Sequence, residues 1–414
     1  MCLSAIIERP NQKRRSIGRP FQLVWWSVVV SSTGDGMFVT AFPLLAATLT
    51  GDPFLIAGVT IASRLPWLMF SMLTGAMADR MDRRRLMVGA DLARFVIVAA
   101  LGVAIAMDVE HIWMLYSCAF ALGTLETLHT NAAQALLVSI VEKRDLMEAN
   151  ARFGSAQVAA VQFAGPPLGA SLFSVAASIP FLADAASFAG SAALIAALAD
   201  DHGVEAPTTR LRDDVREGFL FVLGHPALRR LAAILAVINF FYFSSIALLV
   251  LYTDQILHSG KITYTALFIG AATGTVASRW FVSRLTERFG VVRTIAVSFW
   301  MWATAMVGLA ITSSPVVAVA MFGVLGVGTG FWLVLNTTVR QELTPGRLLG
   351  RMNAAYRTIS WGVVPFGAGF GGLFARAFGL RAPFIVAGVA LALVAALAMP
   401  LLKPIAAAVD PSSR

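Results

Sequence analysis

Long apolar runs alternate with short polar connections along almost the whole chain. A helix of about 20 residues crosses a hydrocarbon core about 30 Å thick, so each run of that length predicts a transmembrane helix. Twelve runs fit this pattern: residues 22–50, 54–77, 87–107, 112–140, 150–173, 178–199, 229–253, 264–283, 291–312, 315–337, 353–375 and 382–402. The pattern therefore predicts an all-α membrane protein.

The longest polar connection, residues 200–228, divides the chain into two halves of six predicted spans each. Within it, Val215, Phe219 and Val222 recur at helical spacing, which predicts an amphipathic helix at the membrane surface. We therefore expect an N-terminal bundle (1–199), a cytoplasmic linker (200–228) and a C-terminal bundle (229–414).

The two halves also echo each other at an offset of about 203 residues. Asn150 and Phe153, which open the fifth span, correspond to Asn353 and Tyr356, which open the eleventh. Duplicated helical bundles of this kind are typical of secondary transporters. The repeat predicts two pseudo-symmetric six-helix bundles around a central site.

The charge of the chain indicates its orientation. Hydrophobic residues make up 58% of the chain and charged residues 13%, against about 25% charged in a soluble domain. The net charge is +9, and 26 of the 32 Lys and Arg residues fall at the termini, in the linker or in connections on that same side. The positive-inside rule then places both termini in the cytoplasm of a bacterial inner membrane, and no nucleic-acid partner is needed. Lys13, Arg14 and Arg15 precede a run too long for a secretory signal, so the first span should remain.

Patterns for catalytic chemistry are weak. Gly323, Gly326, Gly328 and Gly330 follow no strand, so close helix packing is preferred over a dinucleotide loop. The segment at Lys261 lacks the spacing of a phosphate-binding loop, and the two cysteines and five histidines show no zinc spacing. We therefore expect no enzyme, no cofactor and no metal, and a gradient as the source of energy.

Charges in the middle of spans are costly and are functional candidates by default. Asp35, Arg64 and Glu126 lie midway along the first, second and fourth spans and share a depth. One arginine can neutralise one carboxylate, which leaves the other able to bind and release a proton. The three are therefore proton-coupling candidates. The alternative is a structural ion-paired triad that never titrates.

A mixture of aromatic and few polar side chains near this depth suits an amphipathic ligand. In the N-terminal half, helical spacing aligns Glu126, His129 and Gln134 on the fourth span and Asp35, Phe38 and Phe42 on the first. In the C-terminal half, the candidates for the cavity wall are Asn239, Tyr242, Trp332 and Trp361. For each of these aromatics, and for His129, ordinary packing is the alternative.

The connection after the second span reads Gly75-Ala-Met-Ala-Asp79-Arg80-Met-Asp82-Arg83-Arg84-Arg85. It resembles the signature of the major facilitator superfamily, Gly-x-x-x-Asp-Arg-x-Gly-Arg-Arg, at the expected place in a twelve-span chain. The resemblance implies a cytoplasmic latch between the bundles formed by Gly75, Asp79, Arg80 and Arg83. Asp82 stands where the family usually has Gly, which changes the turn and the charge of that latch. Asp91 and Arg94, one turn apart in the third span, are expected to form a gate or to contact Arg83.

The fifth span carries Gly165-Pro166-Pro167-Leu-Gly169, which resembles the antiporter motif of the same superfamily without its upstream glycines. A Pro-kinked packing site is the alternative. The chain also resembles the branch that contains macrolide efflux proteins and the enterobactin exporter. The residues that carry this likeness are Gly34-Asp35-Gly36, Asp91 to Arg94, Asn131, Glu217-Gly218, His225-Pro226 and Gly350-Arg351.

These features predict a proton-coupled exporter of a small amphipathic compound, such as a drug, an antibiotic, a siderophore or another secondary metabolite. It would work as a monomer in the lipid bilayer by rocking of the two bundles. An importer or facilitator is the alternative within transport. A non-transporting receptor or assembly protein on the same fold is the alternative outside it.

Overall fold

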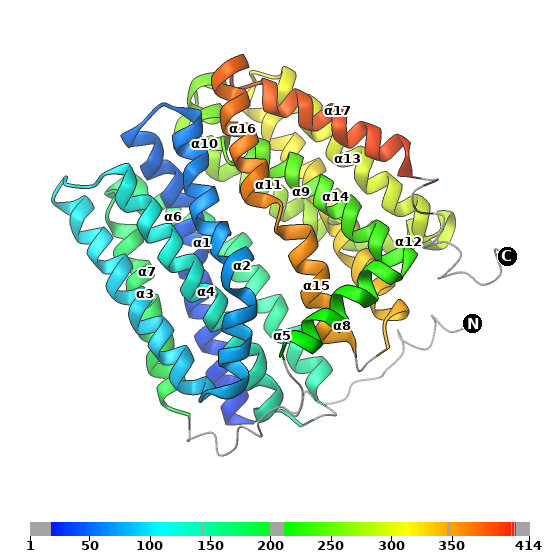
Figure 1. Ribbon diagram of the computed structural model, residues 1–414. Helices are drawn as coiled ribbons and strands as arrows, with labels where there is room; N and C mark the ends of the chain where they lie inside the picture. Colours follow the sequence, from blue (N-terminus) through cyan, green and yellow to red (C-terminus); the bar gives the residue numbers. More distant parts are fainter. Residues whose placement is uncertain are drawn as a thin grey trace.

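The computed structural model describes residues 18–142, 145–198, 211–345, 348–398, 400 and 402, so both termini and most of the linker before α8 lie outside the described residues. All regular elements of the described residues are helical (Figure 1). The N-terminal half contains α1 (Arg19–Leu49), α2 (Pro53–Arg80), α3 (Arg83–Ala106), α4 (Ile112–Ile140), α5 (Leu146–Ala159), η2 (Ala160–Ala164), α6 (Gly165–Val175) and α7 (Ile179–Ala196). After α8 (Leu211–Gly224) come α9 (Pro226–Ile246), α10 (Leu249–Leu251), η3 (Tyr252–Ile256), α11 (Gly260–Ala277), α12 (Arg279–Phe289), α13 (Val291–Ile311), α14 (Pro315–Leu343), α15 (Leu349–Trp361), α16 (Val364–Phe378) and α17 (Ala382–Ala396).

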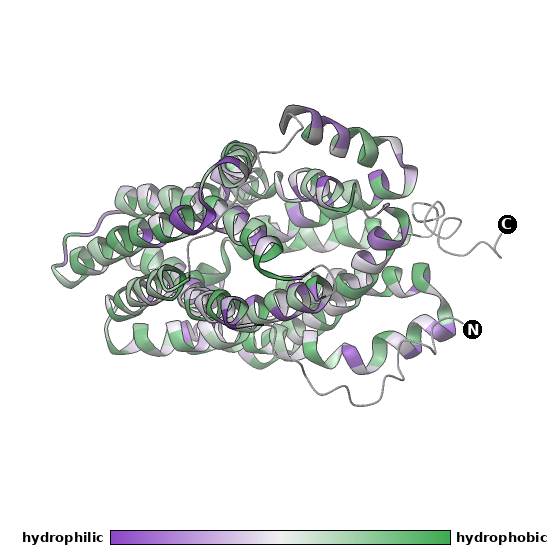
Figure 2. Ribbon diagram, turned by 90° about the horizontal axis from the view of Figure 1, so that it is seen from below, coloured by the Kyte–Doolittle hydropathy of each residue, from purple (hydrophilic) through white to green (hydrophobic). Residues whose placement is uncertain are grey.

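The helices agree with the predicted spans. Eight stretches of the described residues are long and apolar enough to cross a membrane: α1, the first part of α2, α3, α7, α9, α13, α14 and the consecutive α15 and α16. The four other expected spans coincide with α4, with the consecutive α5, η2 and α6, with α11 and with the shorter apolar α17. Hydrophobic residues run along most of these helices (Figure 2). The all-α membrane fold is therefore confirmed.

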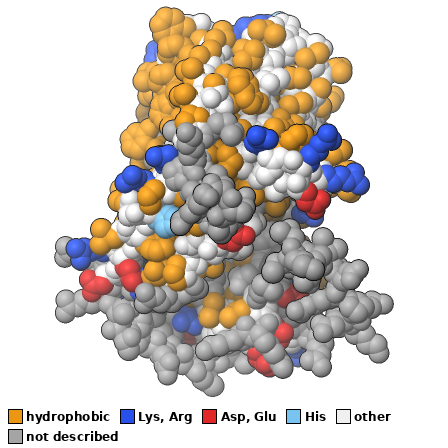
Figure 3. All heavy atoms as spheres, turned by 90° about the vertical axis from the view of Figure 1, so that its right-hand side faces the viewer, with side chains coloured by type: hydrophobic (Ala, Val, Ile, Leu, Met, Phe, Trp, Pro, Cys, Tyr) orange, Lys and Arg blue, Asp and Glu red, His pale blue; other side chains and the backbone are white. Residues whose placement is uncertain are grey.

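The two ends of the helix bundle differ in charge. We call the end that carries α8 the linker face, and the end that carries the α1–α2, α3–α4 and α16–α17 connections the opposite face. Seen from the right-hand side of Figure 1, hydrophobic side chains cover the upper part of the molecule, and acidic and basic side chains gather towards the linker face (Figure 3). This is the polarity of a protein whose upper part is surrounded by lipid.

The linker helix α8 belongs with the C-terminal helices. It packs mainly against α15 and α9, and Arg351 of α15 donates to the carboxylate of Glu217. Gly218 lies directly against the backbone of Arg351, where a Cβ would overlap the carbonyl oxygen. α8 also touches α2, so it connects both bundles at the linker face.

The predicted Pro-containing packing site forms a break in the fifth span. Pro166 and Pro167 cannot donate backbone hydrogen bonds to the preceding turn, and a π-helical turn, η2, lies just before them. The break lies against α1, because a Cβ on Gly36 would be 2.8 Å from the oxygen of Val161 and 2.9 Å from Cα of Gly165. The same segment contacts α11 of the other bundle.

The two bundles contact each other through their halves near the opposite face. α2 packs along α16, where a Cβ on Gly372 would lie 2.8 Å from Cβ of Ala57. Asp52 at the start of α2 pairs with Arg376 of α16 at 3.6 Å. These contacts lie at the end of the bundle at which α10 and α16 converge on α1 and α2 in Figure 1. These contacts hold the bundles together at the opposite face, in addition to the contact of α8 with α2 at the linker face.

The close approach of α1 and α6 can be tested with a single methyl-bearing side chain. Gly165→Val should lower the unfolding temperature of the purified protein in detergent, because its Cβ would overlap the backbone of Gly36. Overpacking of this kind costs about 1–3 kcal/mol. Gly154→Ala is the matched control, since nothing lies within 4 Å of its Cβ position. Equal unfolding temperatures for the two variants would contradict this packing.

Candidate functional site

A small hollow lies inside the N-terminal bundle, where α1, α3, α4 and α5 meet. It has a volume of about 20 Å³, which is enough for one water molecule but far too small for a drug-sized ligand. Asp35, Arg94, Glu126 and His129 line it with their side chains. The sequence-predicted Asp35, Glu126 and His129 therefore do lie together.

Asp91 and Arg94 lie inside the N-terminal bundle and are both buried. Asp91 is fully buried, 3.8 Å from the guanidinium of Arg94 and 3.4 Å from Nε2 of His129. Ser191 of α7 donates a hydrogen bond of 2.6 Å to the same carboxylate. The expectation that Asp91 and Arg94 form a gate stays a prediction.

Asp184 of α7 is a fourth carboxylate at this site, and sequence reasoning missed it. It is 1% exposed, and its Oδ2 has no hydrogen-bond partner among the described residues. Ser187 donates to its Oδ1 at 3.3 Å, and both side chains lie against the bare backbone of Gly34. Asp184 also interacts electrostatically with Asp35 and Arg94. A charge within the sixth span was the signal that could have found it.

The expected triad of Asp35, Arg64 and Glu126 does not form. The arginine that interacts most strongly with Asp35 is Arg94, and Arg64 forms no ion pair with any carboxylate that the structure describes. Arg64 and Glu126 both interact instead with Arg357 of α15. Equal depth along two spans does not determine towards which neighbour each helix turns its side chains. For this reason the sequence wrongly paired Asp35 with Arg64.

Glu126 takes part in a contact between the bundles. Trp67 of α2 donates from Nε1 to Oε2 of Glu126 at 3.3 Å. The guanidinium of Arg357, from the C-terminal bundle, lies 4.2 Å from the centroid of the Trp67 ring. Trp67 was not singled out from the sequence, because an aromatic side chain in a span more often packs against a neighbour. Arg357 was counted only among the basic residues of a connection.

Most predicted cavity residues pack within their own bundle. Phe38 and Phe42 stack on each other at 4.2 Å and contact Phe181. Trp332 is 5% exposed, between Phe299 and Trp302. The remaining candidates differ in environment: Asn239 donates to the oxygen of Ser360 at 2.7 Å, Tyr242 contacts Phe243, and Gln134 and Trp361 are exposed. Phe42 and Trp332 therefore belong to cores and not to a cavity wall.

The latch-like connection is partly described. Asp82, the departure from the family pattern, caps α3 by accepting from the backbone nitrogen of Arg85 at 3.1 Å. Arg83 donates to the oxygen of Ala78 at 3.4 Å and thereby satisfies the end of α2, while Arg80 is exposed. The side chain of Asp79 lies outside the described residues. Gly75 faces α4, where its Cβ position is 3.8 Å from Nδ2 of Asn131.

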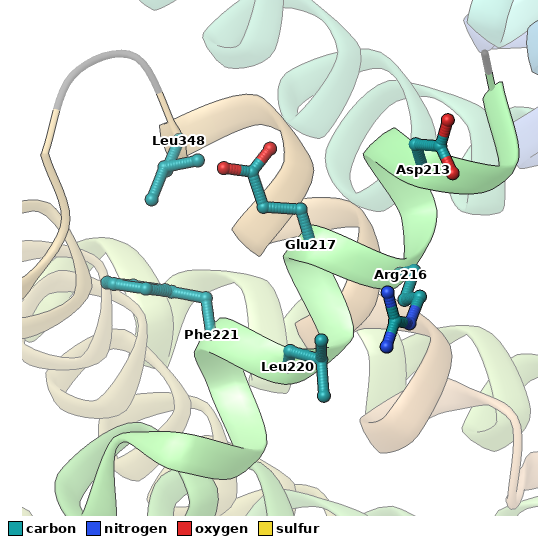
Figure 4. Close-up of a pocket in the computed structure, with 6 residues that line it drawn as sticks. All are labelled: Asp213, Arg216, Glu217, Leu220, Phe221 and Leu348. Atoms are coloured by element: carbon teal, nitrogen blue, oxygen red, sulfur yellow. The ribbon is translucent and has the colours of Figure 1, made fainter.

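A second, larger hollow of about 490 Å³ lies on the linker face. Its walls are α8 and the segment just before α15, and Glu217 and Phe221 point towards Leu348 across it (Figure 4). Arg216 and Leu220 of α8 also line it and are exposed. The hollow contains none of the sequence-predicted site residues, so it is separate from the acidic site.

Comparison with known proteins identifies the group to which this architecture is similar. The sequence model of the transmembrane secretion effector family, a branch of the major facilitator superfamily, matches residues 17–414. Macrolide efflux protein A of Streptococcus pyogenes is 23% identical over 89% of this chain and 92% of its own length. The multidrug efflux pump Tap of Mycolicibacterium fortuitum is 25% identical over 88% and 91%. A bacterial homologue of the lysosomal transporter Spinster, in an inward-facing and unoccupied conformation, superposes with a TM-score of 0.73 at 14% identity, covering 94% of this chain and 97% of the other.

The roles of Asp91 and Asp184 can be distinguished by the unfolding temperatures of their asparagine variants. Asp91→Asn removes a charge that Arg94 and His129 contact directly, and breaking a buried ion pair costs about 3–5 kcal/mol. We therefore expect a clearly lower unfolding temperature in detergent. Asp184→Asn keeps the shape and the Ser187 hydrogen bond and removes a carboxylate beside Asp35, so the unfolding temperature should be unchanged or higher. An equal loss in both variants would contradict this assignment.

Proposed function

The chain belongs to the transmembrane secretion effector family of the major facilitator superfamily, and from this premise we propose that it exports a small amphipathic compound in exchange for protons. It is a multi-pass membrane transporter and not an enzyme. The observation that carries the proton-coupling proposal is the group of buried carboxylates around Arg94. The similarity to proteins named as efflux proteins supports the direction.

The charge balance of the site is the physical basis of the proposal. Asp35, Asp91 and Asp184 interact with a single permanent cation, Arg94. A buried charge without a partner is very costly, so three ionised carboxylates cannot share one arginine inside the bundle. His129 can supply a second positive charge only by binding a proton. We propose that the site therefore binds protons and that their number changes during transport.

We propose that Asp35 or Glu126 is the group whose protonation drives the cycle. Both line the water-sized hollow, and Glu126 also contacts the interface between the bundles through Trp67. A proton would be taken up when the site is open to the periplasm and released to the cytoplasm when cargo binds. Exchange of this kind requires only that proton and cargo favour different conformations.

Alternating access also gives a role to the connection after α2. The described contacts close the opposite face, and a cycle requires them to open while the linker face closes. We propose that Asp79 and Arg83 fasten the linker face in that second conformation. In the present conformation Arg83 donates to the oxygen of Ala78 at the end of α2.

The sidedness follows from the charge distribution and can be tested by labelling. In a chain with Cys2 and Cys118 replaced by Ser, Leu220→Cys reports the linker face and Met107→Cys the opposite face, because both side chains are more than half exposed. A membrane-impermeant maleimide added to intact cells should label Met107→Cys and spare Leu220→Cys until the cells are opened. The reverse pattern would place the linker outside.

The proton-coupling proposal predicts the effect of two amide substitutions. Asp35→Asn and Glu126→Gln remove titration while keeping shape, so one of them should abolish flux driven by an imposed pH gradient in proteoliposomes. Exchange of the same compound across the membrane, measured at saturating concentration without a gradient, should persist in that variant. A panel of amphipathic antibiotics and dyes supplies the cargo, and Asp213→Asn on the exposed side of α8 is the control. Full gradient-driven transport in both amide variants would place proton coupling elsewhere.

A further inference from the structure

Trp67 and Glu126 present an aromatic face and a carboxylate to the same point between the bundles. The Trp67 indole donates to Glu126 at 3.3 Å, so the two side chains are held as one unit by α2 and α4. The Arg357 guanidinium, from α15 of the other bundle, covers the ring at 4.2 Å and interacts electrostatically with Glu126. We infer that Trp67 and Glu126 form the recognition site for an organic cation, and that Arg357 occupies this site when cargo is absent. The inference rests on the proposed transport function and names the chemical class of its cargo.

The chemistry of the pair selects a cation. An aromatic face attracts a positive charge through its quadrupole, and a neighbouring carboxylate adds a direct electrostatic attraction. Organic ammonium and phosphonium ions use this combination well, because their apolar substituents also gain from contact with the ring. A neutral compound of the same shape gains only the apolar contact. The site should therefore discriminate by charge.

The environment of Arg357 suits a displaceable occupant. The side chain is exposed, and no carboxylate lies within ion-pair distance of it in the part of the chain that the structure describes. Arg64 lies close enough to repel it. Arg340, on α14, has a different setting: it donates to Asn353 at 2.8 Å and lies over Tyr356. Arg357 is therefore held mainly by the two groups that a cationic cargo would take over.

Displacement of Arg357 would also connect binding with movement. Trp67 and Glu126 belong to the N-terminal bundle and Arg357 to the C-terminal bundle, so this cation–π contact joins the two bundles. A cation that replaces Arg357 removes that contact between the bundles. The interior hollow of about 20 Å³ is too small for cargo, which leaves the interface as the place where an organic ion can reach Glu126.

The test measures binding of tetraphenylphosphonium to the purified full-length chain by equilibrium dialysis in detergent, without any gradient. Arg357→Ala should tighten binding about tenfold, which corresponds to about 1.4 kcal/mol, because the internal competitor is gone. Arg357→Lys keeps a cation and should stay within about threefold of the parent protein. Trp67→Ala and Glu126→Gln should weaken binding. The double variant Glu126→Gln/Arg357→Ala should bind tetraphenylphosphonium no more tightly than Glu126→Gln alone.

Two controls separate competition from a general loosening of the bundles. Asp52→Asn removes another contact between the bundles, at the opposite face, and keeps the α2 cap, so tetraphenylphosphonium binding should not tighten. Neutral triphenylphosphine oxide should bind equally to the parent protein and to Arg357→Ala. Unchanged or weaker tetraphenylphosphonium binding in Arg357→Ala overturns the inference, as does a gain that persists without the Glu126 carboxylate. If the parent protein shows this binding pattern but no flux driven by a pH gradient, the proton-exchange function alone is refuted.

Discussion

The burial of several carboxylates around one arginine is the constraint on which the N-terminal bundle depends. Arg94 is 2% exposed and lies beside Asp91, within reach of Asp35 and Asp184. Water cannot screen these charges inside the bundle, so the helices must bring the partners together or the bundle loses stability. Ser191 of α7 donates a hydrogen bond to Asp91, and Nε2 of His129 of α4 lies 3.4 Å from the same carboxylate. Four helices are thereby gathered around one guanidinium.

The backbone of α1 is adapted to this site by the glycines on each side of Asp35. Gly34 allows α7 to bring Asp184 and Ser187 against the helix, and Gly36 allows the broken fifth span to pack on the other side. Any larger side chain at either position would push the helices apart and separate the carboxylates. In the fifth span, which packs against Gly36, the π-helical turn before Pro166 provides the surface that fits this glycine. Close packing in a membrane relies on such small residues, because apolar burial alone does not favour helix contact over lipid contact.

The sequence predicted the fold more completely than the site, for a physical reason. Apolar length and the position of charges are one-dimensional properties, and they were sufficient for the spans and for the family. The rotation of each helix about its axis depends on packing between spans that lie far apart in sequence. Asp35 and Glu126 were therefore recognised as acids within spans, whereas Arg64 was assigned as a partner in place of Arg94. Asp184 could have been found by the same rule that found Asp35, because both are charges within a span.

The two halves of the site are linked through Glu126. It lines the hollow that contains Asp35 and Arg94, and it also accepts from Trp67, whose ring carries Arg357 of the other bundle. A change of charge among the interior carboxylates alters the electrostatic environment of Glu126 and hence the attraction that it exerts on Arg357. Separation of the bundles removes Arg357 and alters the charge balance at Glu126 in return. Such reciprocity is a thermodynamic necessity for coupled sites. Under the proposed proton exchange, this link would connect proton binding inside one bundle with movement between the two.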